Sequence, residues 1–100
     1  MDKQISEVLQ VEDPVLFGVE DPVLLRDDLA EYAHVAWAGW MKYLFSKCFI
    51  NRQGDCVIPR DAYKRWYRQM ETSYDDLPEN EKGSDREEAD RMIDIFQAHL

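Results

Sequence analysis

The stretch at residues 28–48, DLAEYAHVAWAGWMKYLFSKC, decides the fold class of this chain. Apolar residues recur along it at spacings of three and four, which is the pattern of one face of an α-helix. The recurring set is Leu29, Ala33, Trp37, Trp40, Leu44 and Cys48. Asp27 or Asp28 can cap such a helix by accepting hydrogen bonds from its first backbone N–H groups. We therefore predict a long helix over residues 28–48.

The chain after this helix shows turn signals and two further helical patterns. Residues 51–55, NRQGD, are turn formers between short apolar segments, so a small hairpin or a plain loop would both fit near residues 49–58. Residues 60–71 have helical periodicity behind Pro59. A short helical turn over 78–82 and a last helix over 85–98, opened by a Ser84–Glu87 capping box, complete the prediction. The predicted fold is mainly α, a small three- to four-helix domain.

The chain before the long helix contains a tandem repeat, VEDPVLFG at residues 11–18 and VEDPVLLR at 19–26. The proline in each copy favours an extended conformation for the preceding aspartate. We therefore predict an extended acidic arm over 1–26 and a helical domain over 27–100. The repeat is either a local duplication in this arm or a pair of docking motifs. In the docking hypothesis the partner-docking carboxylates are Glu12, Asp13, Glu20 and Asp21.

The charge is distributed unevenly along the chain. The formal net charge of the 100 residues is −9, and 33% of residues are charged. Residues 1–28 (eight acids, two bases) and 75–100 (nine acids, three bases) each carry −6, whereas 29–74 (four acids, seven bases) carry +3 and all three Trp. The acidic total disfavours general affinity for nucleic acid or an anionic membrane. The middle of the chain can still accept one small anion.

Other features indicate a cytoplasmic protein. No apolar run approaches the roughly 20 residues of a membrane span, and the start MDKQISEVLQVED lacks the layout of a signal peptide. The two cysteines, Cys48 and Cys56, are too few for a disulfide scaffold, so we expect reduced thiols. If the protein is phage-encoded, the compartment is the cytoplasm of the host cell.

Several motifs along residues 30–96 carry a resemblance to known families. They are His34-x-x-Trp37-x-x-Trp40-Met41-x-Tyr43-Leu44, Ile58-Pro59, Trp66-x-Arg68-Gln69-Met70-x-Thr72-x-Tyr74-x-x-Leu77 and Glu81-Lys82-x-x-Asp85-Arg86-x-x-Ala89-Asp90. With these motifs the chain resembles a family of small uncharacterised bacteriophage and prophage proteins. The part from Tyr74 to Arg86 also looks like the ryanodine-receptor-type repeat domain. The resemblance implies a helical accessory protein that acts against host systems, and it carries over no catalytic activity. The ryanodine-receptor-type likeness implies a domain that binds nucleotide-derived signals.

One set of basic, polar and aromatic residues is the candidate ligand site. It consists of Trp40, Trp66, Arg68, Gln69, Tyr74, Lys82 and Arg86. If their helices meet, guanidinium groups can bind phosphate and aromatic rings can stack on a base. The alternative is that the Trp side chains are core and that the bases pair with neighbouring acids.

The expected function follows from this set and from the resemblance. We expect a non-enzymatic phage-type accessory protein that counteracts a host defence pathway by binding a nucleotide-like anion or a host protein. An alternative is an acidic inhibitor that imitates nucleic acid. A weaker alternative is a metal-dependent nucleotide hydrolase that uses Glu87, Asp90 and Asp94. No catalytic set, cofactor or metal site is predicted, and spare aromatics such as Trp37, Tyr43 and Phe45 suit a homo-oligomer interface.

Overall fold

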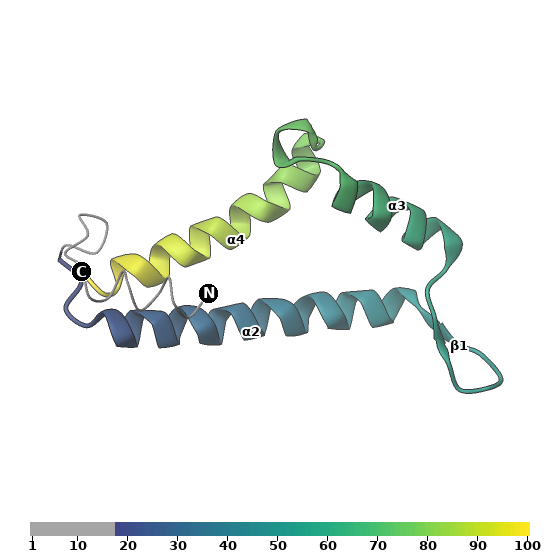
Figure 1. The fold of residues 1–100 in the computed structure, drawn as a ribbon, viewed down its shortest axis with the longest axis horizontal. Coiled ribbons are helices and arrows are strands. Elements are labelled where there is room, and N and C mark those ends of the chain that lie inside the picture. Colours follow the sequence, from purple (N-terminus) through teal and green to yellow (C-terminus); the bar gives the residue numbers. More distant parts are fainter. Residues whose placement is uncertain (1–17) are drawn as a thin grey trace. The chain divides into compact units, whose positions relative to one another are not determined.

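The structure, a computed structural model, describes residues 18–100, and this part of the chain is mainly helical. The elements in order are α2 (Pro22–Lys47), β1 (Phe49–Ile50), β2 (Cys56–Val57), α3 (Arg60–Glu71), the 3₁₀ turn η2 (Tyr74–Asp76) and α4 (Glu79–Gln97) (Figure 1). Among the described residues, 18–34 and 89–100 form one compact unit, unit 1, and 35–88 form another, unit 2. The predicted fold class is confirmed, and near residues 49–58 the hairpin is present rather than a plain loop.

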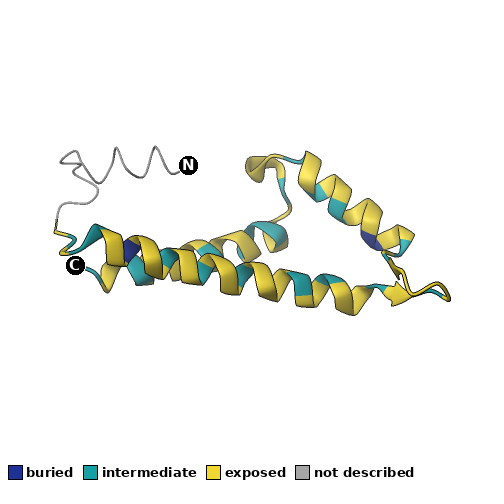
Figure 2. Cartoon of the chain, turned by 60° about the horizontal axis from the view of Figure 1, so that its bottom comes forward, coloured by how far each residue is buried: buried dark blue, intermediate teal, exposed yellow. Residues whose placement is uncertain are grey.

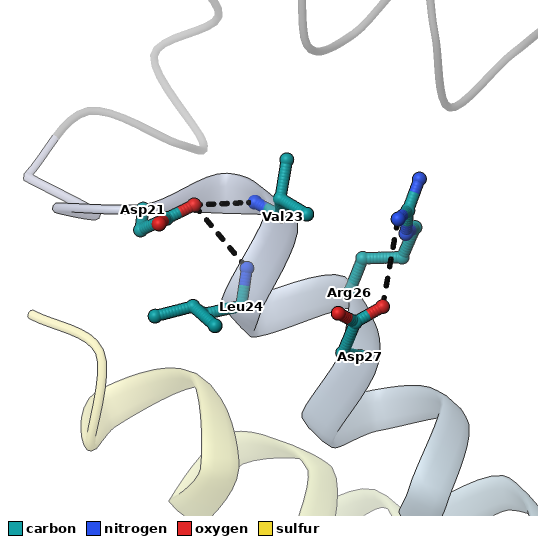
Figure 3. Close-up of polar contacts among 5 residues, drawn as sticks. All are labelled: Asp21, Val23, Leu24, Arg26 and Asp27. Atoms are coloured by element: carbon teal, nitrogen blue, oxygen red, sulfur yellow. Dashed lines mark hydrogen bonds and ion pairs between the residues drawn. The ribbon is translucent and has the colours of Figure 1, made fainter.

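Helix α2 begins at Pro22, earlier than the sequence pattern predicts. The Asp21 Oδ1 atom accepts hydrogen bonds from the backbone N–H of Val23 at 3.0 Å and of Leu24 at 3.3 Å (Figure 3). Pro22 occupies the first helical position, where a missing N–H costs nothing. The predicted start at 28 and the predicted Asp27 or Asp28 cap are therefore wrong. The last five residues of the predicted arm, 22–26, are helical.

Unit 1 joins the start of α2 to the end of the chain. The backbone N–H of Glu20 donates to the carbonyl oxygen of His99 at 3.4 Å. The His99 Nε2 atom lies 2.7 Å from Asp28 Oδ2. Leu25 lies in this unit and is only 4% exposed. Contacts between residues far apart in sequence therefore hold this unit together.

The hairpin of unit 2 is closed by local hydrogen bonds. Its antiparallel register pairs Phe49 with Val57 and Ile50 with Cys56. The side-chain oxygen of Asn51 accepts hydrogen bonds from the backbone N–H groups of Gln53 at 3.0 Å and Asp55 at 2.9 Å. Gly54 has a φ of +88°, a conformation that side chains other than hydrogen disfavour. The sequence NRQGD thus specifies the turn.

Of the two remaining helices, α3 agrees with its prediction and α4 does not. Helix α3 has the predicted bounds. Helix α4 is one continuous helix, whereas a short turn and a separate helix were predicted. The backbone N–H groups of Glu81 and Lys82 both donate to the carbonyl oxygen of Pro78 at 3.0 Å, so helical hydrogen bonding starts directly there. Ser84 then lies inside the helix, and the predicted capping box is wrong.

Few side chains of the described residues are buried. Only Leu25 and Ala62 are classed as buried, and Figure 2 shows one dark blue position on each of α2 and α3. Unit 2 contains an aromatic cluster, in which the Trp40 and Tyr43 ring centroids are 6.0 Å apart and those of Tyr43 and Trp66 are 6.2 Å apart. This cluster packs the second half of α2 against α3.

Candidate functional site

A hollow of about 350 Å³ lies within unit 2. Its lining comes from α2, the end of α3, the connection after η2 and the first turns of α4. The lining residues are Trp40, Gln69, Met70, Leu77, Asn80, Glu81, Ser84 and Asp85. The volume is at the lower end of the range of small-ligand sites in proteins. The hollow is therefore large enough for one long side chain or a small molecule, and it combines apolar walls with two carboxylates.

The carboxylate of Glu81 is held by an ion pair across two helices. Arg68 Nη2 donates to Glu81 Oε2 at 2.6 Å, and the Glu81 side chain is only 15% exposed. This hydrogen bond from Arg68 lowers the pKa of Glu81, desolvation opposes the shift, and the polar side chain of Gln69 adds to the lowering. Glu81 therefore stays ionised at neutral pH.

The second oxygen of Glu81 has a different environment. Glu81 Oε1 is buried and makes no hydrogen bond of good geometry. The Gln69 side chain still contributes to the lowered pKa of Glu81 without making a hydrogen bond to Oε1. Because an ionised oxygen out of contact with water favours a donor, Glu81 Oε1 is an acceptor inside unit 2 that is not fully satisfied.

A second polar cluster surrounds Glu79 and Tyr74. Arg86 Nε donates to Tyr74 Oη at 3.0 Å, and Arg86 Nη1 donates to Glu79 Oε2 at 3.1 Å. The Lys82 ammonium lies 3.8 Å from Glu79 Oε1 and 5.6 Å from the centre of the Tyr74 ring. The pKa of Arg86 is raised, first by its bond to Tyr74 and then by Glu79. This cluster fixes the 3₁₀ turn to the first turns of α4.

The seven predicted ligand-binding residues do not form one site. They lie at the hollow, in the cluster around Glu79 and beside Tyr43. Trp40 and Gln69 line the hollow, and Arg68 binds Glu81 at its edge. Tyr74, Lys82 and Arg86 belong to the cluster around Glu79, while Trp66 packs beside Tyr43. Because Arg68, Lys82 and Arg86 all have carboxylate partners, an anion would have to displace Glu79 or Glu81.

The site residues that sequence reasoning missed are those that make the hollow acidic and apolar. They are Met70, Leu77, Asn80, Glu81, Ser84 and Asp85. Arg68 and Glu81 are 13 residues apart and lie on different helices, so no helical spacing rule connects them. The signal that was available is the run of carboxylates following Pro78.

The predicted docking carboxylates divide into two pairs. Glu12 and Asp13 lie outside the described residues. Glu20 is exposed, and Asp21 caps α2. Asp21 therefore has a structural role that accounts for its position without a partner.

The two cysteines are free thiols: Cys48 directly precedes β1, and Cys56 is the first residue of β2. Cys48 Sγ donates to the carbonyl oxygen of Leu44 at 3.1 Å. Desolvation raises the pKa of Cys48, and a hydrogen bond and charge interaction with Cys56 raise it further. The Cys48 thiol is therefore held in its protonated form at neutral pH.

Within residues 18–100, no group of three or more His, Cys, Asp or Glu side chains is arranged to hold a metal ion. The stripe of Glu87, Asp90 and Asp94 on α4 is therefore not such a group. No helix in this range has the length and apolar character needed to cross a membrane.

Comparisons of the chain with family models, with curated proteins and with solved structures find no match. The resemblance to phage proteins and to the ryanodine-receptor-type domain therefore stays a prediction.

Proposed function

We propose that the chain is a non-enzymatic accessory protein that binds a basic segment of a partner protein, with the hollow of unit 2 taking one Lys or Arg side chain. The observation that carries this proposal is the lining of the hollow, which includes Glu81 and Asp85 but no basic residue. A basic side chain combines an alkyl stem with a charged head. The stem would lie against Trp40 and Met70, and the head would reach the carboxylates.

The electrostatics of the site support a cation rather than an anion as the bound group. Glu81 is kept ionised by Arg68, and Asp85 is the second carboxylate of the lining. A guanidinium or ammonium group in the hollow would be attracted by both carboxylates. A nucleotide-like anion would instead meet two carboxylates in the hollow and bases already paired with Glu79 and Glu81. The protein-partner form of the expected function is thus favoured over the ligand form.

The charge of the whole chain supports the same class of partner. A net charge of −9 accelerates encounter with a basic protein surface. Nucleic-acid-binding proteins present such surfaces, which agrees with the predicted alternative of an acidic inhibitor. The resemblance to small phage proteins supports a host protein as the partner, and the two free thiols suit action in the cytoplasm.

The test is titration of the protein with capped tetrapeptides, Leu-Arg-Leu-Arg and its counterpart Leu-Glu-Leu-Glu, followed by NMR of the Trp40 indole N–H. We expect a saturable shift with the arginine peptide only. Asp85→Asn should weaken binding about tenfold, the scale of one lost charge-assisted contact. Glu87→Gln is the matched control, because Glu87 is on the same helix but does not line the hollow.

The same titration with cyclic dinucleotides and ADP-ribose tests the alternative that the protein binds a nucleotide-like anion. Saturable binding of a nucleotide, together with no response to the arginine peptide, would establish the ligand form of the function and reject the proposal. Equal shifts with both tetrapeptides would show that charge does not select the partner, which also rejects it.

A further inference from the structure

The second half of α2 is apolar around its whole circumference. Residues 35–45, VAWAGWMKYLF, contain a single charged side chain, Lys42. At 100° per residue these positions occupy every side of the helix. A helix that is apolar on all sides is covered on all sides in a stable protein. This segment therefore needs more contacts than one neighbouring helix provides.

Unit 2 covers only one side of this segment. Tyr43 packs against Trp66 of α3, and Ala36 and Leu44 are partly buried. The opposite side is open, since Val35 and Phe45 are each 59% exposed. Ala38 and Lys42 lie between them at helical spacing and are exposed as well. We call the side formed by Val35, Ala38, Lys42 and Phe45 the open face of α2.

The apolar area left exposed in unit 2 is large enough for a stable interface. Ten large apolar side chains between residues 35 and 74, not counting Trp40 and Met70 of the hollow, are at least 42% exposed. At 150–250 Å² for a whole aromatic side chain, their exposed parts sum to roughly 900 Å², spread over several elements of unit 2. A standard interface takes about 800 Å² from each partner and only somewhat more than half of that is apolar, so an interface centred on the open face needs only part of this area. Within residues 35–88 only Ala62 is buried, so burial inside one copy provides little of the core that a unit of this size needs.

The charge of this region favours a second copy over the basic partner proposed for the hollow. The open face has one cation and no carboxylate, so it does not attract a basic segment. Residues 35–88 contain nine Lys and Arg and ten Asp and Glu, a net charge of −1. Two copies of unit 2 can therefore approach without strong repulsion, although the whole chain is acidic.

We infer that a second copy of this chain covers the open face of α2, so that the two α2 helices pack on each other in a two-fold symmetric dimer. In such an interface the same patch serves both partners. Small side chains such as Ala38 allow close helix approach, while Phe45 of each copy fills the space beside Val35 of the other. The Lys42 stems can lie along the rim with their ammonium groups in water. The interface does not use the lining of the hollow, so it stands or falls independently of the proposed function.

Sedimentation equilibrium of the full chain tests this inference. We expect a dimer at micromolar concentration. For Phe45→Glu we expect the dimer dissociation constant to rise about 100-fold or more, because a carboxylate would enter an apolar interface. Leu24→Glu is the control: Leu24 is 55% exposed on the same helix but lies outside the open face. Its dimerisation should equal that of the unchanged protein.

A measurement on the unchanged protein avoids the risk that Phe45→Glu fails to fold. The Tm of a dimer that dissociates on unfolding rises with protein concentration, so it should increase by several degrees between about 2 and 200 µM. A monomer with a concentration-independent Tm would overturn the inference, and so would a trimer. Equal weakening by Phe45→Glu and Leu24→Glu would also overturn it. Binding of the arginine peptide is measured separately and does not depend on either outcome.

Discussion

Glu81 shows how one residue on α4 connects the stability of unit 2 to its candidate site. One carboxylate oxygen takes a short hydrogen bond from Arg68, and the other is buried beside Gln69 without a well-aligned donor. The ion pair lowers the pKa of Glu81 against an opposing desolvation effect. A carboxyl group whose pKa is lower in the folded state stabilises the fold when it is ionised. The same residue lines the hollow, where its negative charge would attract a partner's cation.

The Arg68–Glu81 pair should make stability depend on acid pH. Its contribution is fully present above the ordinary Glu pKa of 4.5 and is lost as the pH falls through the lowered folded value. We expect Arg68→Met to lower the Tm at pH 7 and the gap from the unchanged protein to narrow below pH 4.5. Thermal scans by circular dichroism between about pH 7 and pH 3 measure this. Arg60→Met, in the first turn of α3, should give a gap that does not change with pH, and a constant gap for Arg68→Met would contradict the assignment.

At the scale of elements, the sequence correctly predicts those helices and turns that are specified by residues close together in the chain. Helix α3 has the predicted bounds because Pro59 and an amphipathic pattern both mark it, and the hairpin follows from Asn51 and Gly54. The sequence pattern predicts too late a start for α2, because Asp27 and Asp28 both have the residue type of a helix cap. The residue that caps the helix is Asp21. The Arg68–Glu81 pair and the acidic hollow could not be predicted, since they depend on how α3 and α4 meet.

The cap of α2 provides a direct comparison between two neighbouring carboxylates (Figure 3). Asp21 accepts two backbone N–H groups, whereas Asp27 makes one exposed ion pair of 3.5 Å with Arg26. We expect Asp21→Ala to lower the free energy of unfolding by about 1 kcal/mol. Asp27→Ala should change it by less than about 0.5 kcal/mol. Urea denaturation at fixed protein concentration measures both, and equal losses would mean that Asp21 is not the functional cap.

At the scale of the whole molecule, the acidic charge and the apolar surface have separate roles. The net charge of −9 resides mainly in the two terminal segments, whereas the exposed aromatic side chains are concentrated in unit 2. Long-range attraction of a basic partner therefore comes from the chain as a whole. Short-range contacts in the hollow and on the open face of α2 then distinguish one occupant from another.

This division predicts opposite responses to salt for the two proposed associations. Raising NaCl from about 20 to 300 mM should weaken binding of the arginine peptide several-fold, because screening removes the attraction of the net charge. Dimerisation should be unchanged or strengthened, because it is apolar and the net charges repel. Calorimetry and sedimentation at the same salt concentrations compare them. Peptide binding that does not respond to salt would show that the net charge has no part in recognition.

The residue ranges that make up the two units also determine the order in which the units can fold during synthesis of the chain. Unit 2 is one continuous segment, so all its contacts are available once residue 88 has left the ribosome. Unit 1 needs the His99–Asp28 contact, which joins residues 71 positions apart. Contacts of such separation form late, because a long loop must close first. The aromatic cluster can therefore form before residues 89–100 reach the first turns of α2, and unit 1 is completed after unit 2.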